Sequence, residues 1–345
     1  MKNKVFIRVD GNEIIASGHV MRCLSIAAQI RKLGAEAVFI TADHNPQPVI
    51  MEAGFTCKVL DSDYSRLESE IDRMRELLTE EKAEVLLVDS YFVTKTYFSK
   101  LADLVKIVYI DDFLNTPYSV SGLIHYSVFE GKERADELYR QLPKPDLLFG
   151  GLYAPLREEF SNSNMVIRQQ VRTVLITTGG ADRLGMSIHL LEKLKEQSYF
   201  NEITVRIISG RFNQNLEQLN KIAEGLGNVE ILVNVRNMAE RMMESDVVIS
   251  ASGTTLYELA AVGVPSICFE VADNQKGAEI WEKEGLMLYG GNAEIDLSAC
   301  LRNCIKHLET YINHYEERFG RSQKMRTLVD GKGAMRIAAY LTEWN

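Results

Sequence analysis

Residues 4–22 read KVFIRVDGNEIIASGHVMR, and this stretch decides the fold. It begins with a mostly apolar run, which is typical of a strand in a parallel sheet that helices cover on both faces. Asp10 ends the run, a polar loop follows, and Ser17 and Gly18 open an amphipathic helix that extends to about Leu33. A strand, a loop and a helix in this order begin a β-α-β unit, so the sequence predicts an α/β fold.

The same alternation continues along the chain. Further buried strands are predicted at 37–41, 57–60, 84–90, 106–112, 121–126, 173–180, 203–209, 229–234, 246–253 and 265–271. Helices are predicted at 46–53, 66–81, 94–103, 186–197, 213–225, 237–244, 255–262, 296–318 and 332–343. Apolar strands joined by helices indicate parallel sheets, and therefore doubly wound Rossmann-like domains.

The chain is expected to form two such domains. Its 345 residues exceed what one hydrophobic core usually organises. A linker is expected at 153–170, where Pro155 and the polar run SNSN interrupt the pattern. We predict one domain at 1–155 and a second at 170–320. Doubly wound sheets bind ligands at the carboxyl ends of their strands, so a crevice between the domains is the expected site.

Composition excludes several classes of function. The net charge is −9 without a long basic run, which argues against a nucleic-acid partner or an anionic membrane surface. No apolar stretch approaches the 18 residues of a membrane span, and Asp10 interrupts the only run that could begin a signal peptide. The five cysteines are scattered and read as reduced thiols, so a cytoplasmic protein without a metal site is expected. The oligomeric state stays open, with a monomer as the working expectation.

The first candidate site lies at the beginning of the first helix. Gly18 lets the backbone approach a ligand, and His19 sits in the first turn, where the helix dipole favours a neutral imidazole that could accept a proton. Arg22 lies three residues on and Asp10 lies at the strand tip, which makes a polar cluster where an apolar face is otherwise expected. Asp10, Gly18 and Arg22 are therefore predicted to contact the substrate. The alternative is a histidine that only packs or caps the helix.

Glycine-rich turns in the second half could hold a phosphate. Each follows a strand and precedes a helix, where free backbone amides favour an anion. The residues concerned are Gly179 and Gly180 in TTGGAD, and Ser252, Gly253, Thr254 and Thr255 in SGTT. Glu258, one turn further, could accept hydrogen bonds from a ribose. A capping box, in which Thr255 caps and Glu258 reaches back, fits the same spacing equally well.

Two other strand ends carry polar side chains. Asn274 and Gln275 follow the strand at 265–271 and offer paired donors and acceptors, although such a dipeptide is more often a turn. Asp111 and Asp112 end a strand of the first half, and they would suit a metal only with a third carboxylate nearby. Neither half contains the glycine fingerprint of a nicotinamide dehydrogenase.

Several segments together resemble one known family. In order along nearly the whole chain they read RVDGNEIIASGHVMRCLSIA, VDSYFVTKTY, GGLYAPLREEF, ITTGGAD, SASGTTLYELAAVGVPSICF, DNQKG and VDGKGAMRIA. They are similar to the UDP-2,4-diacetamido-2,4,6-trideoxy-β-L-altropyranose hydrolases of pseudaminic acid biosynthesis, to which spore-coat polysaccharide biosynthesis proteins are related. The resemblance implies a glycosyltransferase-B-like fold, with a C-terminal helix at 325–345 that returns to the first domain.

The resemblance also implies roles for individual residues. The family's glycine-histidine motif falls on Gly18 and His19, which makes His19 the base. Tyr91, Asn274 and Gln275 fall on positions near the sugar. The glycosyltransferase-like element SGTT..E implies that the second domain binds UDP, with its last residue, the glutamate, at the ribose. The family usually has another glycine where this chain has Ala16, which could narrow the sugar pocket.

These observations predict a cytoplasmic UDP-sugar hydrolase that needs no metal and no cofactor. His19 would remove a proton from water as the water attacks the anomeric carbon, and direct displacement of UDP would invert that centre. Two other functions stay open. One is a glycosyltransferase that uses a UDP-sugar donor in polysaccharide or spore-coat biosynthesis. The other is a nucleotide-sugar binding protein without catalytic activity.

Overall fold

The computed structural model describes residues 4–12, 18–129, 131–163, 165–210, 212–272 and 275–343. Three residues discussed above lie outside the described residues: the predicted site residue Asn274, the predicted helix cap Ser17, and Ala16, which replaces the family's glycine. The chain divides into two compact units, one formed by Met1–Glu158 with Gly331–Asn345 and the other by Glu159–Asp330. Each unit has its own sheet and its own core.

The first unit is built on a seven-stranded sheet in the order β3-β2-β1-β4-β5-β6-β7. Its strands are β1 (Lys4–Val9), β2 (Glu36–Thr41), β3 (Thr56–Val59), β4 (Val85–Asp89), β5 (Lys106–Ile110), β6 (Gly122–His125) and β7 (Asp146–Phe149). All neighbouring strands run parallel. The chain reverses its direction of winding between β3 and β4, which is the doubly wound order that the sequence predicts.

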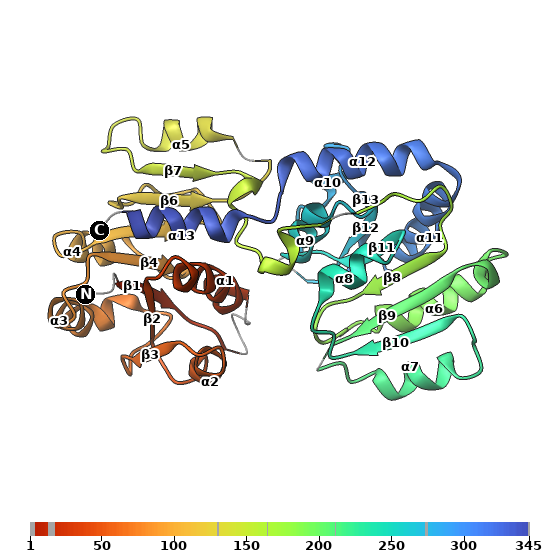
Figure 1. Cartoon of the computed structure of the whole chain (residues 1–345), viewed down its shortest axis with the longest axis horizontal. Coiled ribbons are helices and arrows are strands. Elements are labelled where there is room, and N and C mark those ends of the chain that lie inside the picture. Colours follow the sequence, from red (N-terminus) through yellow and green to blue (C-terminus); the bar gives the residue numbers. More distant parts are fainter. Residues whose placement is uncertain are drawn as a thin grey trace. The chain divides into compact units, whose positions relative to one another are not determined.

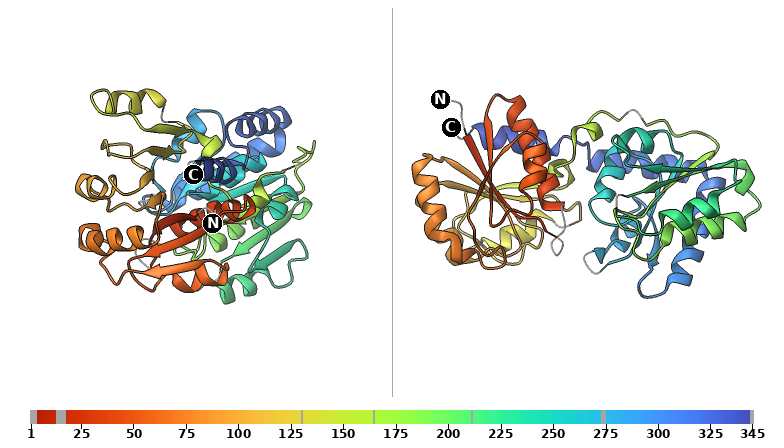
Figure 2. Two further views of the ribbon diagram at one scale, coloured as in Figure 1. Left: turned by 60° about the vertical axis from the view of Figure 1, so that its left-hand side comes forward. Right: turned by 90° about the horizontal axis from the view of Figure 1, so that it is seen from below.

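Helices cover both faces of this sheet. They are α1 (Gly18–Lys32), α2 (Gln47–Glu52), α3 (Ile71–Glu80), α4 (Lys95–Leu101), α5 (Lys132–Leu138) and α13 (Gly333–Glu343), with short 3-10 turns η1 (Leu67–Glu70) and η2 (Gly151–Tyr153). Alternate residues of β1 enter different cores: Val5 and Ile7 pack with α1 and α13, whereas Phe6 packs with α3 and α4. The last helix, α13, lies beside α1, the first (Figures 1 and 2).

The second unit repeats the plan with six parallel strands in the order β10-β9-β8-β11-β12-β13. The strands are β8 (Thr173–Thr177), β9 (Thr204–Ser209), β10 (Val229–Val233), β11 (Val247–Ala251), β12 (Ser266–Glu270) and β13 (Leu288–Asn292). The helices and turns are η3 (Glu158–Phe160), α6 (Met186–Lys195), η4 (Phe200–Glu202), α7 (Leu216–Ala223), α8 (Met238–Met243), α9 (Thr255–Val262), α10 (Glu279–Lys283), α11 (Leu297–Asn313) and α12 (Tyr315–Leu328). The prediction of two doubly wound parallel domains is confirmed.

The sequence did not predict the strands β7 and β13, which end their sheets. β7 has only four residues, and β13 reads LYGGN, which lacks the branched side chains that mark a strand. Gly290 of β13 is required by close packing, because a Cβ there would lie 2.4 Å from the Sγ of Cys304. The pairing of β13 with β12 also shifts register between Cys268 and Phe269, which is typical of a strand that contains glycine.

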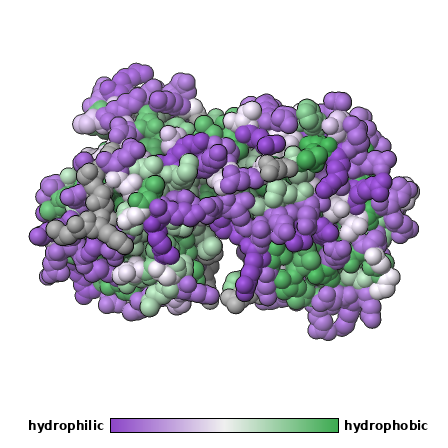
Figure 3. Space-filling view, viewed as in Figure 1, coloured by the Kyte–Doolittle hydropathy of each residue, from purple (hydrophilic) through white to green (hydrophobic). Residues whose placement is uncertain are grey.

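The described helices give no sign of a membrane segment. None of them has the length together with the apolar composition that crossing a bilayer requires. The face of the molecule seen in Figure 3 carries mostly hydrophilic side chains, with apolar ones in separate small patches.

Candidate active site

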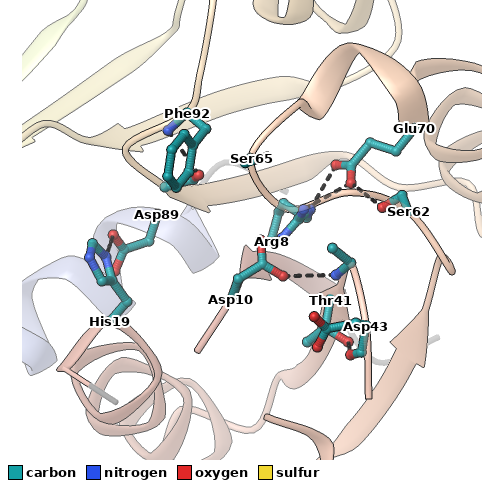
Figure 4. A network of polar contacts seen from close by, with 12 residues as sticks. Arg8, Asp10, His19, Thr41, Asp43, Ser62, Ser65, Glu70, Asp89 and Phe92 are labelled. Carbon is teal, nitrogen blue, oxygen red and sulfur yellow. Dashed lines mark hydrogen bonds and ion pairs between the residues drawn. The ribbon is translucent and has the colours of Figure 1, made fainter. Parts of the chain in front are cut away.

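His19 lies where two central strands of the first unit end together. β1 and β4 are neighbours in the sheet, and Val9 pairs with Asp89, so both strands deliver their last residues to one edge. Helix α1 begins at Gly18 and returns His19 to the same edge. There His19 Nδ1 lies 2.5 Å from Asp89 Oδ1 (Figure 4). Gly18 is exposed, and a Cβ at this position would meet no atom within 4 Å.

Asp89 also accepts from the guanidinium of Arg22 and, at 3.5 Å, from the thiol of Cys23. Arg22 Nε and Nη2 donate to the two carboxylate oxygens of Asp89 at 2.6 and 2.5 Å. The other edge of the same guanidinium donates to Asp112 at 2.9 and 3.0 Å, and Nη1 also donates to the hydroxyl of Tyr126 at 2.6 Å. One arginine therefore joins two carboxylates, and its planar donors are taken up by protein acceptors.

The two carboxylates differ in exposure. The side chain of Asp89 is fully buried, and that of Asp112 is 22% exposed. Burial by itself would raise the pKa of Asp89, but the charges of Arg22 and His19 and the hydrogen bonds from both hold this pKa well below its ordinary value. Asp89 is therefore ionised at neutral pH, and its negative charge is available to a histidine that takes up a proton.

The ring of Tyr91 packs against the ring of His19. Its ring meets the ring of His19 edge to face, with centroids 4.4 Å apart and an interplanar angle of 81°. Burial and the negative charge of the neighbouring Asp112 carboxylate raise the pKa of Tyr91 to about 12. Tyr91 is therefore a neutral phenol, which suits it to packing and hydrogen bonding at this edge.

Asp10 belongs to a separate network. Its carboxylate accepts from Arg8 at 2.5 Å and from the backbone amide of Ala42 at 2.8 Å, and it is 4% exposed. Arg8 in turn pairs with Glu70 at 2.7 and 2.8 Å (Figure 4). Glu70 also accepts from the hydroxyl of Tyr97 at 2.8 Å. Of the predicted polar residues of this unit, the structure joins His19 and Arg22 through Asp89, and it gives Asp10 other partners.

The glycine-rich turn of the second unit follows β8. Gly179 and Gly180 are both exposed there, after the buried end of the strand. Asp182 closes the turn by accepting from the amides of Met186 and Ser187 at the start of α6, at 2.8 and 3.3 Å. Asp182 thus holds the protein's own backbone, and the two glycines are left at the surface of the loop.

The second predicted phosphate turn joins β11 to α9. Ser252 is fixed to Phe269 by two hydrogen bonds, in which its amide and its hydroxyl donate to that carbonyl at 2.8 and 2.9 Å. Gly253 has a φ of 120°, which a residue with a Cβ adopts only under strain. Within the described residues, the amides of Gly253, Thr254 and Thr255 donate to no protein acceptor.

The start of α9 also decides between two sequence interpretations. Thr254 occupies the N-cap position, Thr255 is the first helical residue, and no side chain caps the helix. The capping box with Thr255 as its cap is therefore not formed. Glu258 is half-buried in the first turn. Together with the uncapped amides, these features leave the helix end open to an anion.

The Asn-Gln pair is only partly described. Asn274 lies outside the described residues. Gln275 is half-buried, and its Oε1 accepts from the amide of Val271 at 2.9 Å, which closes the loop after β12. Glu270 supports the same loop by accepting from the amide of Ala278 at 2.9 Å.

Sequence reasoning missed two members of the histidine cluster, Asp89 and Asp112. Each follows an apolar strand directly, in VLLVD and in KIVYIDD, so a carboxylate at a strand end was visible. The contact between Asp89 and His19 was not visible in the sequence, because it requires β4 to lie beside β1 in the sheet. Asp112 was considered only as a metal ligand. Among the described residues, no group of three His, Cys, Asp or Glu side chains is arranged to hold a metal ion.

Comparison with known proteins supports the sequence resemblance. The family model of the glycosyltransferase family 28 C-terminal domain matches residues 173–279. The UDP-2,4-diacetamido-2,4,6-trideoxy-beta-L-altropyranose hydrolase of Campylobacter jejuni is 25% identical over 286 residues, which are 81% of this chain and 95% of that protein. The spore coat polysaccharide biosynthesis protein SpsG of Bacillus subtilis is 23% identical over 201 residues, 58% of this chain and 57% of that protein. The predicted resemblance to this group is confirmed.

Other matches bear on length and fold. An uncharacterized protein of Methanocaldococcus jannaschii is 26% identical over 276 residues, 76% of this chain but only 55% of that protein, so the chain spans about half of this relative. The crystal structure of MurG from Acinetobacter baumannii superposes with a TM-score of 0.72 at 13% identity and covers 99% of both chains. With the two parallel sheets, this likeness shows the predicted glycosyltransferase-B fold.

Proposed function

We propose that this relative of nucleotide-sugar enzymes hydrolyses a UDP-linked sugar, releasing UDP and the free sugar, with His19 as the general base. The observation that carries the proposal is the contact of 2.5 Å between His19 Nδ1 and Asp89. It leaves Nε2 as the reactive nitrogen, and within the described residues Nε2 makes no hydrogen bond. The name and the near-complete coverage of the Campylobacter jejuni hydrolase support the same reaction.

The proposed step is a direct displacement. Nε2 of His19 takes a proton from water while the water oxygen forms a bond to the anomeric carbon. The bond between that carbon and the oxygen of the β-phosphate breaks, and its electron pair leaves with UDP. Attack opposite to the leaving group inverts the anomeric centre. General-base assistance of this kind contributes about 10²–10⁴-fold in rate.

Asp89 and Arg22 act on His19 in this scheme and do not touch the substrate. The carboxylate of Asp89 fixes the ring through Nδ1 and stabilises the imidazolium that forms during the step. Arg22 holds Asp89 in place through two hydrogen bonds. Because the donors of Arg22 are engaged by Asp89, Asp112 and Tyr126, we propose that it positions these groups. This role replaces the direct contact with substrate that the sequence suggested for Arg22.

The second unit supplies the electrostatic stabilisation of the leaving group in this proposal. Amides of Gly253, Thr254 and Thr255 at the open start of α9, with those of Gly179 and Gly180, would hold the diphosphate. Glu258 would accept from the ribose. Asn274 and Gln275 would lie near the sugar, as the resemblance implies. Backbone amides offer the positive end of a dipole where charge develops, so the scheme includes no metal ion.

A glycosyltransferase is the second candidate function. The match of residues 173–279 to a glycosyltransferase family 28 domain favours it, because this part of the chain includes both glycine-rich turns. In that reaction a hydroxyl of an acceptor replaces water, and the base and the diphosphate site keep their roles. A protein that binds the nucleotide-sugar without turnover would use the same residues for affinity alone.

Incubation with UDP-sugars in the absence of any acceptor separates these functions. The first substrate to try is the UDP-2,4-diacetamido-2,4,6-trideoxy-altropyranose named for the relative. NMR would follow the release of UDP and the configuration of the sugar that appears first. A hydrolase gives stoichiometric UDP and an inverted sugar. Release that requires an added acceptor would establish a transferase, and binding of UDP without any turnover would overturn both enzymatic proposals.

A further inference from the structure

Two half-exposed aromatic rings continue outward from His19. Tyr91 is 47% exposed and Phe113 is 50% exposed, although aromatic side chains of this size usually bury most of their surface. The centroids of Tyr91 and Phe113 are 5.1 Å apart, and Tyr91 contacts His19 at 4.4 Å. The three rings therefore form one row, which we call the aromatic wall, with the reactive histidine at its inner end.

The backbone is built to expose Phe113. Oδ1 of Asp111 accepts from the amides of Phe113 and Leu114, both at 2.9 Å, and forms a tight turn after β5. Asp111 is itself anchored, because its carbonyl accepts from His125 Nδ1 at 2.6 Å. Leu114 has a φ of 47°, an unfavourable conformation for leucine, and it is 1% exposed. The turn buries Leu114 and keeps Phe113 outside, and strain of this kind is concentrated at functional sites.

A carboxylate borders the wall. Asp112 directly precedes Phe113 in the chain and accepts from Arg22, while part of its side chain reaches solvent. Its negative charge also acts on the hydroxyl of Tyr91. A carboxylate has about four acceptor positions, so Asp112 can accept a further donor. Arg22 faces two carboxylates, Asp89 and Asp112, so these three side chains together carry one net negative charge.

We propose that the aromatic wall binds the apolar face of the sugar ring, with Asp112 accepting from one of its N–H or O–H groups, and that Phe113 thereby determines specificity. Pockets that combine aromatic surface with a few placed polar groups orient ligands in this way. The site would select uncharged sugars that have an apolar, deoxygenated face, and it would reject uronic acids, whose carboxylate meets the negative edge. This inference rests on the proposed function, because it assigns the sugar to the same site.

Binding in a His19→Ala background tests the wall without turnover. Calorimetry would compare UDP with UDP-N-acetylglucosamine, with the 6-deoxy form of this sugar and with UDP-glucuronic acid. We expect the 6-deoxy sugar to bind more tightly than UDP, and the uronic acid more weakly. Adding Phe113→Ala should lower the affinity for the nucleotide-linked 6-deoxy sugar about 10-fold, because a contact with one small apolar group contributes about this much. The affinity for UDP should stay unchanged.

A matched control is an aromatic pair on α12, Tyr315 and Phe319, whose rings stack with centroids 6.0 Å apart. Phe319→Ala removes a ring that is 41% exposed and should leave the affinity for every probe unchanged. Phe113→Tyr keeps the ring and should restore the preference. If Phe113→Ala leaves the ratio of the affinities for UDP-sugar and UDP unchanged, the wall is overturned, whether or not the wild-type protein hydrolyses these sugars. Failure of the wild-type protein to release UDP would instead count against the proposed function.

Discussion

At the carboxyl edge of its sheet, the first unit gathers buried charged side chains, whereas the second unit presents backbone amides. His19, Arg22 and Asp89 are each less than a tenth exposed, and they bond to one another. In the second unit the buried carboxylates of Asp182 and Glu270 bond to backbone amides of their own loops. The first arrangement can move a proton, and the second can hold an anion. This difference is the basis on which we propose chemistry for the first unit and nucleotide binding for the second.

The largest expected effect comes from His19→Ala. Removing the proposed base should lower kcat by about 10²–10⁴-fold, because that is what general-base assistance contributes. The affinity for UDP should not change, since the amides proposed to bind it belong to the second unit. Steady-state kinetics and calorimetry with UDP would measure the two effects separately.

A matched control is His189→Ala, which changes a histidine on α6 whose side chain is 40% exposed. This variant should keep both kcat and UDP affinity. If the His19→Ala enzyme kept the wild-type kcat, His19 would not be the base, and the proposed difference in role between the two units would be wrong.

Asp89→Asn should cause the next largest effect, a loss of stability confined to the first unit. It leaves Arg22 buried with fewer counter-charges, and breaking a buried ion pair from one side costs about 3–5 kcal/mol. Native-state hydrogen exchange, read on peptides of each unit, would locate the loss. The control is Asp103→Asn, which removes an ion-pair partner of Arg75 at a site where the carboxylate is 61% exposed, so solvent screens the pair and the loss of stability should be far smaller.

The same aspartate predicts how stability depends on acid. Its pKa is lower in the folded protein than in the unfolded chain, so its stabilising contribution is complete above the ordinary aspartate pKa. The contribution is lost as the pH falls through the folded-state pKa. The first unit of the wild-type protein should therefore weaken more steeply in acid than that of Asp89→Asn. Equal acid dependence of the two proteins would show that Asp89 is not held ionised by Arg22 and His19.

The sequence predicted the candidate site residues of the two units to different extents. Apolar strands alternating with helices were enough to predict both parallel sheets except for the edge strands β7 and β13. The position of His19 at a strand-to-helix junction was readable from residues 8–22. The partners of His19 were not readable, because Asp89 and Asp112 come 70 and more residues later, and only the strand order brings them near. Asp10 shows the opposite limit. Asp10 lies close to His19 in the sequence, yet it pairs with the buried Arg8 and not with the histidine cluster.

The glycine-rich turns of the second unit were easier to predict because the conformation of a turn depends on the local backbone. Gly253 precedes a helix directly, and its left-handed φ follows from the residue type that the sequence shows. The absence of a cap on α9 was not readable, since the capping box fits the same four letters. Local motifs therefore identify a candidate anion site, and the structure is needed to decide whether the protein's own side chains already occupy it.

Gly253→Ala tests the proposal that backbone amides bind the nucleotide. At a φ of 120° a Cβ forces the turn to rearrange, so the amides at the start of α9 should lose their alignment. We expect UDP affinity to fall about 10-fold, close to the 1–2 kcal/mol that unfavourable backbone conformations cost. Calorimetry with UDP would measure it. Gly320→Ala, inside α12 where a Cβ meets no atom within 4 Å, should leave the affinity unchanged, and equal losses in the two variants would contradict a local role.

The smallest expected effect is that of Asp182→Ala. Asp182 accepts from the amides of Met186 and Ser187, so it acts as a cap for α6, and losing a cap costs about 1 kcal/mol. The loss should appear as faster hydrogen exchange at the start of α6, while kcat stays within about 2-fold of wild type, because Asp182 holds backbone and does not face the reaction. Asp296→Ala, at the cap of α11, is the matched control and should cost a similar amount of stability. A fall in kcat near that of His19→Ala would show that the second unit also contributes a reacting side chain, and the division between side-chain chemistry and amide binding would then be wrong.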